Sequence, residues 1–166
     1  NIFSKYGLKN NFLVNFRNIN YEAKNVEPYK NDTTSEVFGA FGFSSELNLE
    51  KNSGSLKHFL TPKVLFRYSP GSMRKEEQGF ILDPINAFSL NRLENLNNYE
   101  TGSTSTVGFD YKIKRNDKKL DFSLAQVISE KENKKMHSQT SMDEKLSDLT
   151  GTANLQLNKN FSINYK

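Results

Sequence analysis

Apolar and polar side chains alternate along most of this chain with a period of two residues. The clearest stretch covers residues 37–49. One face of that stretch reads Val37, Gly39, Phe41, Phe43, Ser45, Leu47 and Leu49. The opposite face reads Phe38, Ala40, Gly42, Ser44, Glu46 and Asn48. Successive side chains of a β-strand point to opposite faces, so this alternation predicts a strand with one largely apolar face.

The same alternation recurs in six further stretches, which predicts about seven strands in all. These stretches are residues 12–17, 60–69, 106–113, 120–129, 149–157 and 161–165. We expect strands of roughly 9–13 residues, which is longer than the 5–6 residues usual in soluble proteins. It is close to the roughly 9–11 residues that a strand needs to cross a bilayer.

The predicted connections alternate between long and short. The long ones cover residues 22–33, 70–98 and 130–146, and the short ones residues 51–55, 115–119 and 158–160. In an up-and-down meander every second connection lies at the same end of the sheet. One end is therefore expected to carry tight turns and the other end long polar loops, as in outer-membrane barrels.

The polar face decides between a membrane barrel and a soluble β-sandwich. A sandwich must bury its apolar face under a second layer. The connections here are polar, and only residues 79–93 hold enough apolar side chains to form a short element. We therefore expect lipid to cover the apolar face and the polar face to line a wet lumen. The predicted fold class is all-β: an antiparallel up-and-down meander that is part of a large transmembrane β-barrel. A soluble β-sandwich binding module remains an alternative.

Composition narrows these possibilities further. The chain of 166 residues has no cysteine, which excludes a disulfide or a thiolate site within it. The net charge of +4 comes from 23 basic and 19 acidic residues that are interspersed, so we expect no nucleic-acid partner. No window resembles a transmembrane helix or a secretory leader. Because the chain begins at Asn1 and its last predicted strand is cut short, we expect residues 1–166 to be an internal segment of a larger barrel.

Few residues suggest bond chemistry. His58 and His137 lie far apart and outside any ligand cluster, so we expect no metal, no cofactor and no catalytic site. Lys63 and Arg67 share the polar face of one predicted strand, about 13 Å apart along it. Two interpretations remain open for them: contacts to phosphates of a lipid headgroup, or ion pairs with lumen carboxylates such as Asp110.

Residues 83–92 look more ordered than a free loop. Asp83 and Arg92 are predicted to pair inside the lumen and to pin this loop as a lid or plug contact. Residues 130–145 are rich in charges of both signs, which is typical of a solvated extracellular loop.

Four ordered stretches resemble the barrel domain of the LptD (OstA or Imp) family, most closely its alphaproteobacterial members. They are Leu60-Thr-Pro-Lys-Val-Leu-Phe-Arg-Tyr-Ser-Pro70, Asp83-Pro-Ile-Asn-Ala-Phe-Ser-Leu-Asn-Arg92 followed by Glu100-Thr-Gly102 and Gly108, Phe122-Ser-Leu-Ala-Gln126, and Ser147-Asp-Leu-Thr-Gly151. Two features depart from the family pattern: Ala125 stands where Gly is common, and residues 94–99 lack a Gly-x-Asp-Arg motif.

The resemblance implies a non-catalytic role in the wall of a very large outer-membrane barrel of a Gram-negative bacterium. That barrel would assemble lipopolysaccharide into the outer leaflet. The implied partners are lipopolysaccharide, an LptE-like lipoprotein plug, outer-membrane lipid, and a periplasmic LptA-like bridge that acts through a jellyroll domain. Another outer-membrane barrel, such as a porin or receptor, is the main alternative function.

Overall fold

The computed structural model describes residues 7–27, 29–158 and 160–166, and it is all-β. The described residues form one antiparallel sheet in the order β1-β2-β4-β5-β6-β7-β8, with β3 paired to β4. The strands are β1 (Leu8–Ala23), β2 (Asp32–Leu47), β3 (Leu49–Ser53), β4 (Leu56–Ser69), β5 (Gly102–Arg115), β6 (Lys118–Ser129), β7 (Thr150–Asn158) and β8 (Phe161–Tyr165). Two short 3-10 turns, Asn86–Phe88 and Gln139–Ser141, lie in the connections. No helix in the described part of the chain is long and apolar enough to cross a membrane.

The predicted meander is confirmed, with one refinement at residues 37–49. The single strand predicted there is divided at Asn48 into β2 and β3. Strand β2 pairs with both β1 and β4, whereas β3 pairs with β4 through Leu49↔Leu60 to Ser53↔Leu56. Strands β1 and β2 are also longer than the alternation predicts, at 16 residues each.

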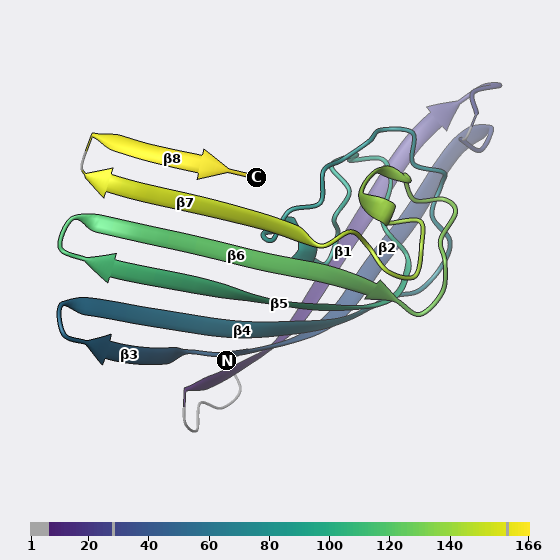
Figure 1. The fold of residues 1–166 in the computed structure, drawn as a ribbon. Helices are drawn as coiled ribbons and strands as arrows, with labels where there is room; N and C mark the ends of the chain where they lie inside the picture. Colours follow the sequence, from purple (N-terminus) through teal and green to yellow (C-terminus); the bar gives the residue numbers. More distant parts are fainter. Residues whose placement is uncertain (1–6, 28, 159) are drawn as a thin grey trace.

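The two ends of the sheet differ as predicted. Two-residue turns join β3 to β4 and β5 to β6 at one end, where Gly54 (φ 59°) and Asn116 (φ 51°) adopt the left-handed conformation that tight turns require. The connections between β1 and β2, β4 and β5, and β6 and β7 all lie at the opposite end (Figure 1). The connection from β4 to β5 covers residues 70–101 and that from β6 to β7 covers residues 130–149.

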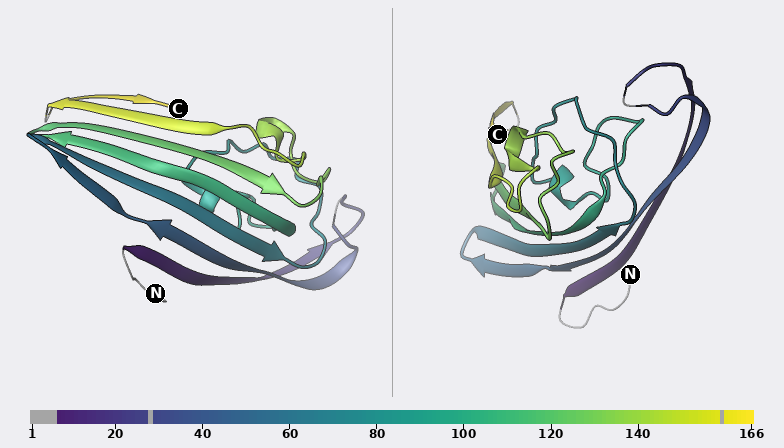
Figure 2. Two further views of the ribbon diagram at one scale, coloured as in Figure 1. Left: turned by 60° about the horizontal axis from the view of Figure 1, so that its bottom comes forward. Right: turned by 90° about the vertical axis from the view of Figure 1, so that its right-hand side faces the viewer.

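The sheet is curved, and its two faces have different surroundings. The two long connections fold back onto the concave face, while the convex face has no cover from the described residues (Figure 2). Large apolar side chains of the convex face are exposed, with 67% of Phe16, 73% of Val37 and 52% of Phe66 accessible. No second sheet occurs among the described residues, so the structure does not support the soluble sandwich alternative.

The core lies on the concave side, between the sheet and the two long connections. Its members are Met73, Phe80, Leu82, Ala87, Leu93, Ala125, Val127, Met136 and Met142. The short element expected in residues 79–93 is present as the turn Asn86–Phe88. Residues 130–145 were expected to form a solvated loop, but Met136 and Met142 within them fold inward and are buried. Burial of these thioethers against Ala125 and Val127 of β6 explains why the connection returns to the sheet.

Candidate functional site on the concave face

Charged residues of the strands occupy the concave face at the positions that the alternation predicts. Lys63 of β4 forms an ion pair of 2.8 Å with Asp110 of β5, and its ammonium group lies 4.7 Å from the ring centroid of Phe88. Lys112 lies 3.6 Å from Asp121 across the β5–β6 ladder. Both cations therefore have a carboxylate of a neighbouring strand as partner, Lys63 in Asp110 and Lys112 in Asp121.

Arg67 lies four residues beyond Lys63 on the same face of β4, and it is buried against the connection of residues 70–101. Its guanidinium donates hydrogen bonds to the backbone carbonyls of Leu90, Glu100 and Gly102. One of its nitrogens also lies 3.6 Å from Oε1 of Glu100. Arg67 therefore fastens both ends of one loop segment to β4.

Arg92 enters the same cluster from the loop side. It forms an ion pair with Glu100 and donates hydrogen bonds to Oγ1 of Thr104 (3.0 Å) and Oγ1 of Thr106 (3.1 Å) on β5. Thr106 in turn donates to the carbonyl of Ala87 at 2.8 Å. The side chains of Arg67 and Arg92 are fully buried, and that of Glu100 is 2% exposed. Burial lowers the pKa of the Arg92 guanidinium below its ordinary value, and the neighbouring Glu100 carboxylate opposes that shift.

The predicted pairing of Asp83 with Arg92 is wrong. Asp83 accepts hydrogen bonds from the backbone N–H groups of Ile85 (2.8 Å) and Asn86 (2.9 Å), and Lys166 approaches it to 3.6 Å. Partial burial acts to raise the pKa of Asp83, but the two backbone donors and Lys166 outweigh it and lower that pKa. Asp83 therefore fixes the start of the Asn86–Phe88 turn, and Arg92 takes Glu100 as its carboxylate.

A second cluster joins the same loop to the projecting hairpin of β1 and β2. The guanidinium of Arg74 lies 5.0 Å from the ring centroids of both Tyr21 and Tyr29 and pairs with Glu36. Arg17 of β1 donates a hydrogen bond to the carbonyl of Asn98, and its guanidinium lies 5.6 Å from the centroid of the Tyr99 ring. Arg74 was missed by sequence reasoning, and Glu100 was noted only within the Glu100-Thr-Gly102 stretch, because neither residue belongs to an alternating stretch.

These two clusters hold the loop segments in position on the concave face. The guanidinium groups of Arg67 and Arg92 donate their hydrogen bonds to oxygens of the protein itself. In the described part of the chain, no group of three or more His, Asp or Glu side chains could hold a metal ion. The clusters fix residues 70–101 on the concave face, which the lid or plug interpretation of residues 83–92 requires. A contact of Lys63, Arg67, Asp83 or Arg92 with a lipid headgroup stays a prediction.

Comparison of the sequence with known protein families shows which family this chain belongs to. The family described as LptD, LPS transport system D, matches residues 1–166. This chain belongs to the LptD family. Comparisons with the curated proteins and with the solved structures gave no match. Membership of the LptD family assigns the chain to lipopolysaccharide transport and assembly at the outer membrane, and it favours this role over that of a porin or receptor.

Proposed function

We propose that residues 1–166 form a segment of the wall of a large outer-membrane barrel. This barrel is the part of an LptD-type translocon that assembles lipopolysaccharide into the outer leaflet. In this role the chain separates lipid from a polar lumen and carries no catalytic group. The observation that supports this most strongly is the single-layer sheet with an exposed apolar convex face.

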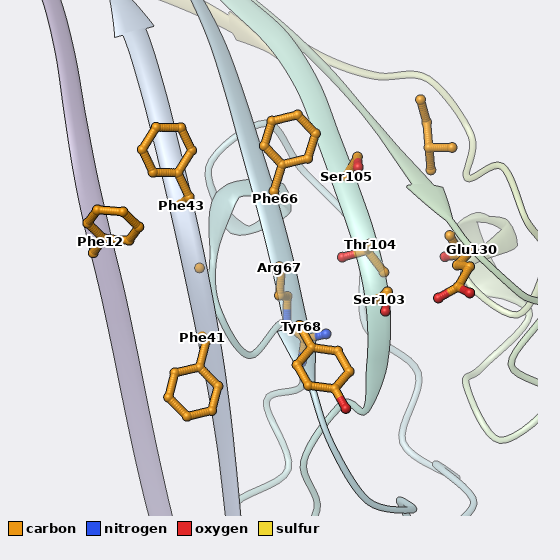
Figure 3. A pocket seen from close by; sticks show the side chains of 13 residues that line it. Phe12, Phe41, Phe43, Phe66, Arg67, Tyr68, Ser103, Thr104, Ser105 and Glu130 are labelled. Carbon is orange, nitrogen blue, oxygen red and sulfur yellow. The ribbon is translucent and has the colours of Figure 1, made fainter.

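That convex face is too apolar for water. Rings of Phe12, Phe41, Phe43, Phe66 and Tyr68 project from β1, β2 and β4 on the same side and line an open groove of about 540 Å³ (Figure 3). Soluble monomers rarely expose continuous apolar patches larger than a few hundred Å². Hydrocarbon tails would cover such a surface without any specific partner.

Strand length agrees with a bilayer. Strand β4 has 14 residues, which corresponds to a length of about 46 Å at 3.3 Å per residue. A tilt of about 45° reduces its projection to about 33 Å, close to the roughly 30 Å hydrocarbon thickness. The tight turns and long loops then lie on opposite sides of the membrane, which by the usual outer-membrane arrangement places the long loops outside.

The two unpaired edges of the sheet are the reason to propose that the barrel wall continues on both sides of it. Within the described residues β1 pairs with β2 alone, and β8 pairs with β7 alone. In lipid, unpaired backbone N–H and C=O groups at such edges each cost several kcal/mol. We propose that further strands of a larger barrel pair with both edges.

The concave face then borders the lumen, and its two folded connections narrow it. The proposed partners there are lipopolysaccharide and an LptE-like plug. We propose an LptA-like periplasmic bridge as a further partner that acts through a jellyroll domain. Outer-membrane lipid is the partner of the convex face.

Photocrosslinking in Gram-negative cells tests this function. A photoreactive residue at Asp110, on the concave face, should crosslink to the plug lipoprotein or to lipopolysaccharide. The matched position Val107 lies on the same strand and faces outward, so it should crosslink to lipid alone. Crosslinks from Val107 to another protein layer, together with none from Asp110 to either partner, would contradict the proposal.

A further inference from the structure

Positive charge is concentrated at the tip of the β5–β6 hairpin. Residues 112–121 contain five basic side chains, Lys112, Lys114, Arg115, Lys118 and Lys119, and only two acidic ones, Asp117 and Asp121. A ten-residue segment thus carries a net charge of +3, while the whole chain carries +4. This segment lies at the tight-turn end of the sheet, opposite the long connections (Figure 1).

The strand register places like charges directly opposite each other. Arg115 pairs with Lys118, and Lys114 pairs with Lys119. Like charges at directly opposed positions destabilise a sheet, and alternatives such as Thr would avoid this cost. Among the described residues Lys119 has Asp121 as an ion-pair partner at 2.5 Å, but Arg115 and Lys118 have none.

Arg115 and Lys118 lie on the convex face, which the proposed function exposes to lipid. They continue the outward positions Ile113 of β5 and Leu120 of β6, since residues two apart share a face. Directly beside them is a groove of about 230 Å³. Five aliphatic side chains line this groove, among them Leu120, Leu155 and Leu157, together with three basic residues, Arg115, Lys118 and Lys119.

We propose that this groove is a binding site for an acidic phospholipid. The phosphate bridges Arg115 and Lys118, whose opposed positions bring their Cβ atoms to about 5 Å, and one acyl chain lies along Leu120, Leu155 and Leu157. A guanidinium and an ammonium supply the charge-assisted donors that a phosphodiester accepts. The phosphate also supplies the counter-charge that the opposed cations lack within the described chain.

The position of this groove in the fold indicates which lipid supplies the phosphate. The site rests on the proposed function, which places the tight turns at the periplasmic side. The lipid of that leaflet within reach is therefore a glycerophospholipid with a net negative headgroup, and not the lipopolysaccharide of the opposite leaflet.

Lipid titration followed by native mass spectrometry tests the site on the intact, detergent-solubilised protein. Phosphatidylglycerol is compared with phosphatidylcholine and with a purified lipid A. Two variants are compared with wild type: Arg115→Gln/Lys118→Gln, which removes both outward cations, and Lys112→Gln/Lys114→Gln, which removes two charges from the concave face of the same hairpin. Circular dichroism confirms that each variant keeps its β-structure.

Wild type should bind phosphatidylglycerol more tightly than phosphatidylcholine or lipid A. The outward variant should lose this preference, with binding roughly 25-fold weaker because each basic residue near a membrane surface contributes about a fivefold factor. The concave-face variant should bind within about twofold of wild type, since its charges do not face the groove. Equal binding of all three lipids, a preference for lipid A, or equal losses in both variants would each overturn the proposal.

A separate measurement distinguishes this site from the wall function. If wild type inserts into vesicles but shows no phosphatidylglycerol preference, the lipid site fails and the wall function stands. If wild type does not insert at all, the wall function fails and the lipid site fails with it.

Discussion

Replacement of Glu100 by Gln removes the single carboxylate from a cluster that holds two buried guanidinium groups. Glu100 contacts Arg92 directly and lies 3.6 Å from Arg67, and both arginine side chains have no solvent exposure. Loss of one partner of a buried ion pair typically costs about 3–5 kcal/mol, because the other charge stays buried without compensation. Gln has nearly the same size and shape as Glu100, so this cost reports the loss of the carboxylate and not the loss of packing.

The cost should appear as opening of residues 70–101 and not as unfolding of the sheet. The β-ladder between β4 and β5 does not depend on Glu100, whereas Arg92, which anchors the loop, does. A loss of 3–5 kcal/mol in loop stability raises the open population between about 100-fold and a few thousand-fold.

Trypsin cleavage after Arg92 measures this opening in the purified protein. Arg92 is 2% exposed and can be cleaved only when the loop opens, so the cleavage rate follows the open population. The control is Glu77→Gln, because Glu77 is an exposed carboxylate of the same loop and its replacement should leave the rate unchanged within about threefold. Cleavage of Glu100→Gln at the wild-type rate would refute the role of this cluster.

Four further substitutions probe the loop and the sheet. Asp83→Ala should cost about 1 kcal/mol of loop stability at neutral pH, because two backbone donors lose their acceptor. The pKa of Asp83 is lower in the folded protein than its ordinary value of 3.8. The stability that Asp83 contributes to the loop is therefore present above pH 3.8 and is lost as the pH falls through the lower folded pKa. Cleavage by an acid-active protease can follow this loss. Gly108→Ala should cost about 1–3 kcal/mol in chemical denaturation, because its Cβ would collide with the backbone carbonyl oxygen of Leu124. Gly151→Ala should cost less, since the atom nearest to its Cβ is the movable Cδ2 of the Leu124 side chain and the nearest backbone atom is at an ordinary contact distance of 3.5 Å. Arg74→Lys should raise trypsin cleavage after Arg92 about fivefold, because a lysine stacks less well on the two tyrosine rings, and an unchanged rate would exclude that contact as an anchor.

The alternation of side chains predicted the meander because it is a local property. Residues two apart share a face whatever the rest of the chain does. The positions of the tight turns and the sides of Lys63 and Asp110 followed from this period alone, as the ion pair between them shows. The break at Asn48 was not predicted, since it depends on where the neighbouring strands begin and end.

The fold of the long connections could not be derived from local pattern. Asp83 and Arg92 are oppositely charged and close in sequence, and the sequence therefore predicted an ion pair between them. The backbone turn beside Asp83 satisfies its carboxylate, and Arg92 reaches Glu100, which follows eight residues later. Such choices depend on which side chains become buried together, and burial of Met136 and Met142 likewise became visible only in three dimensions.

Spin-label accessibility along β5 tests most directly whether lipid covers the convex face. The chain contains no cysteine, so single cysteines at position 107 and at positions 109–112 can be labelled without background from it. In reconstituted membranes, collision with oxygen should be highest at Val107, Phe109 and Tyr111, and collision with a water-soluble nickel chelate should be highest at Asp110 and Lys112. Equal accessibility at odd and even positions, or odd positions shielded from both reagents by protein, would contradict the account.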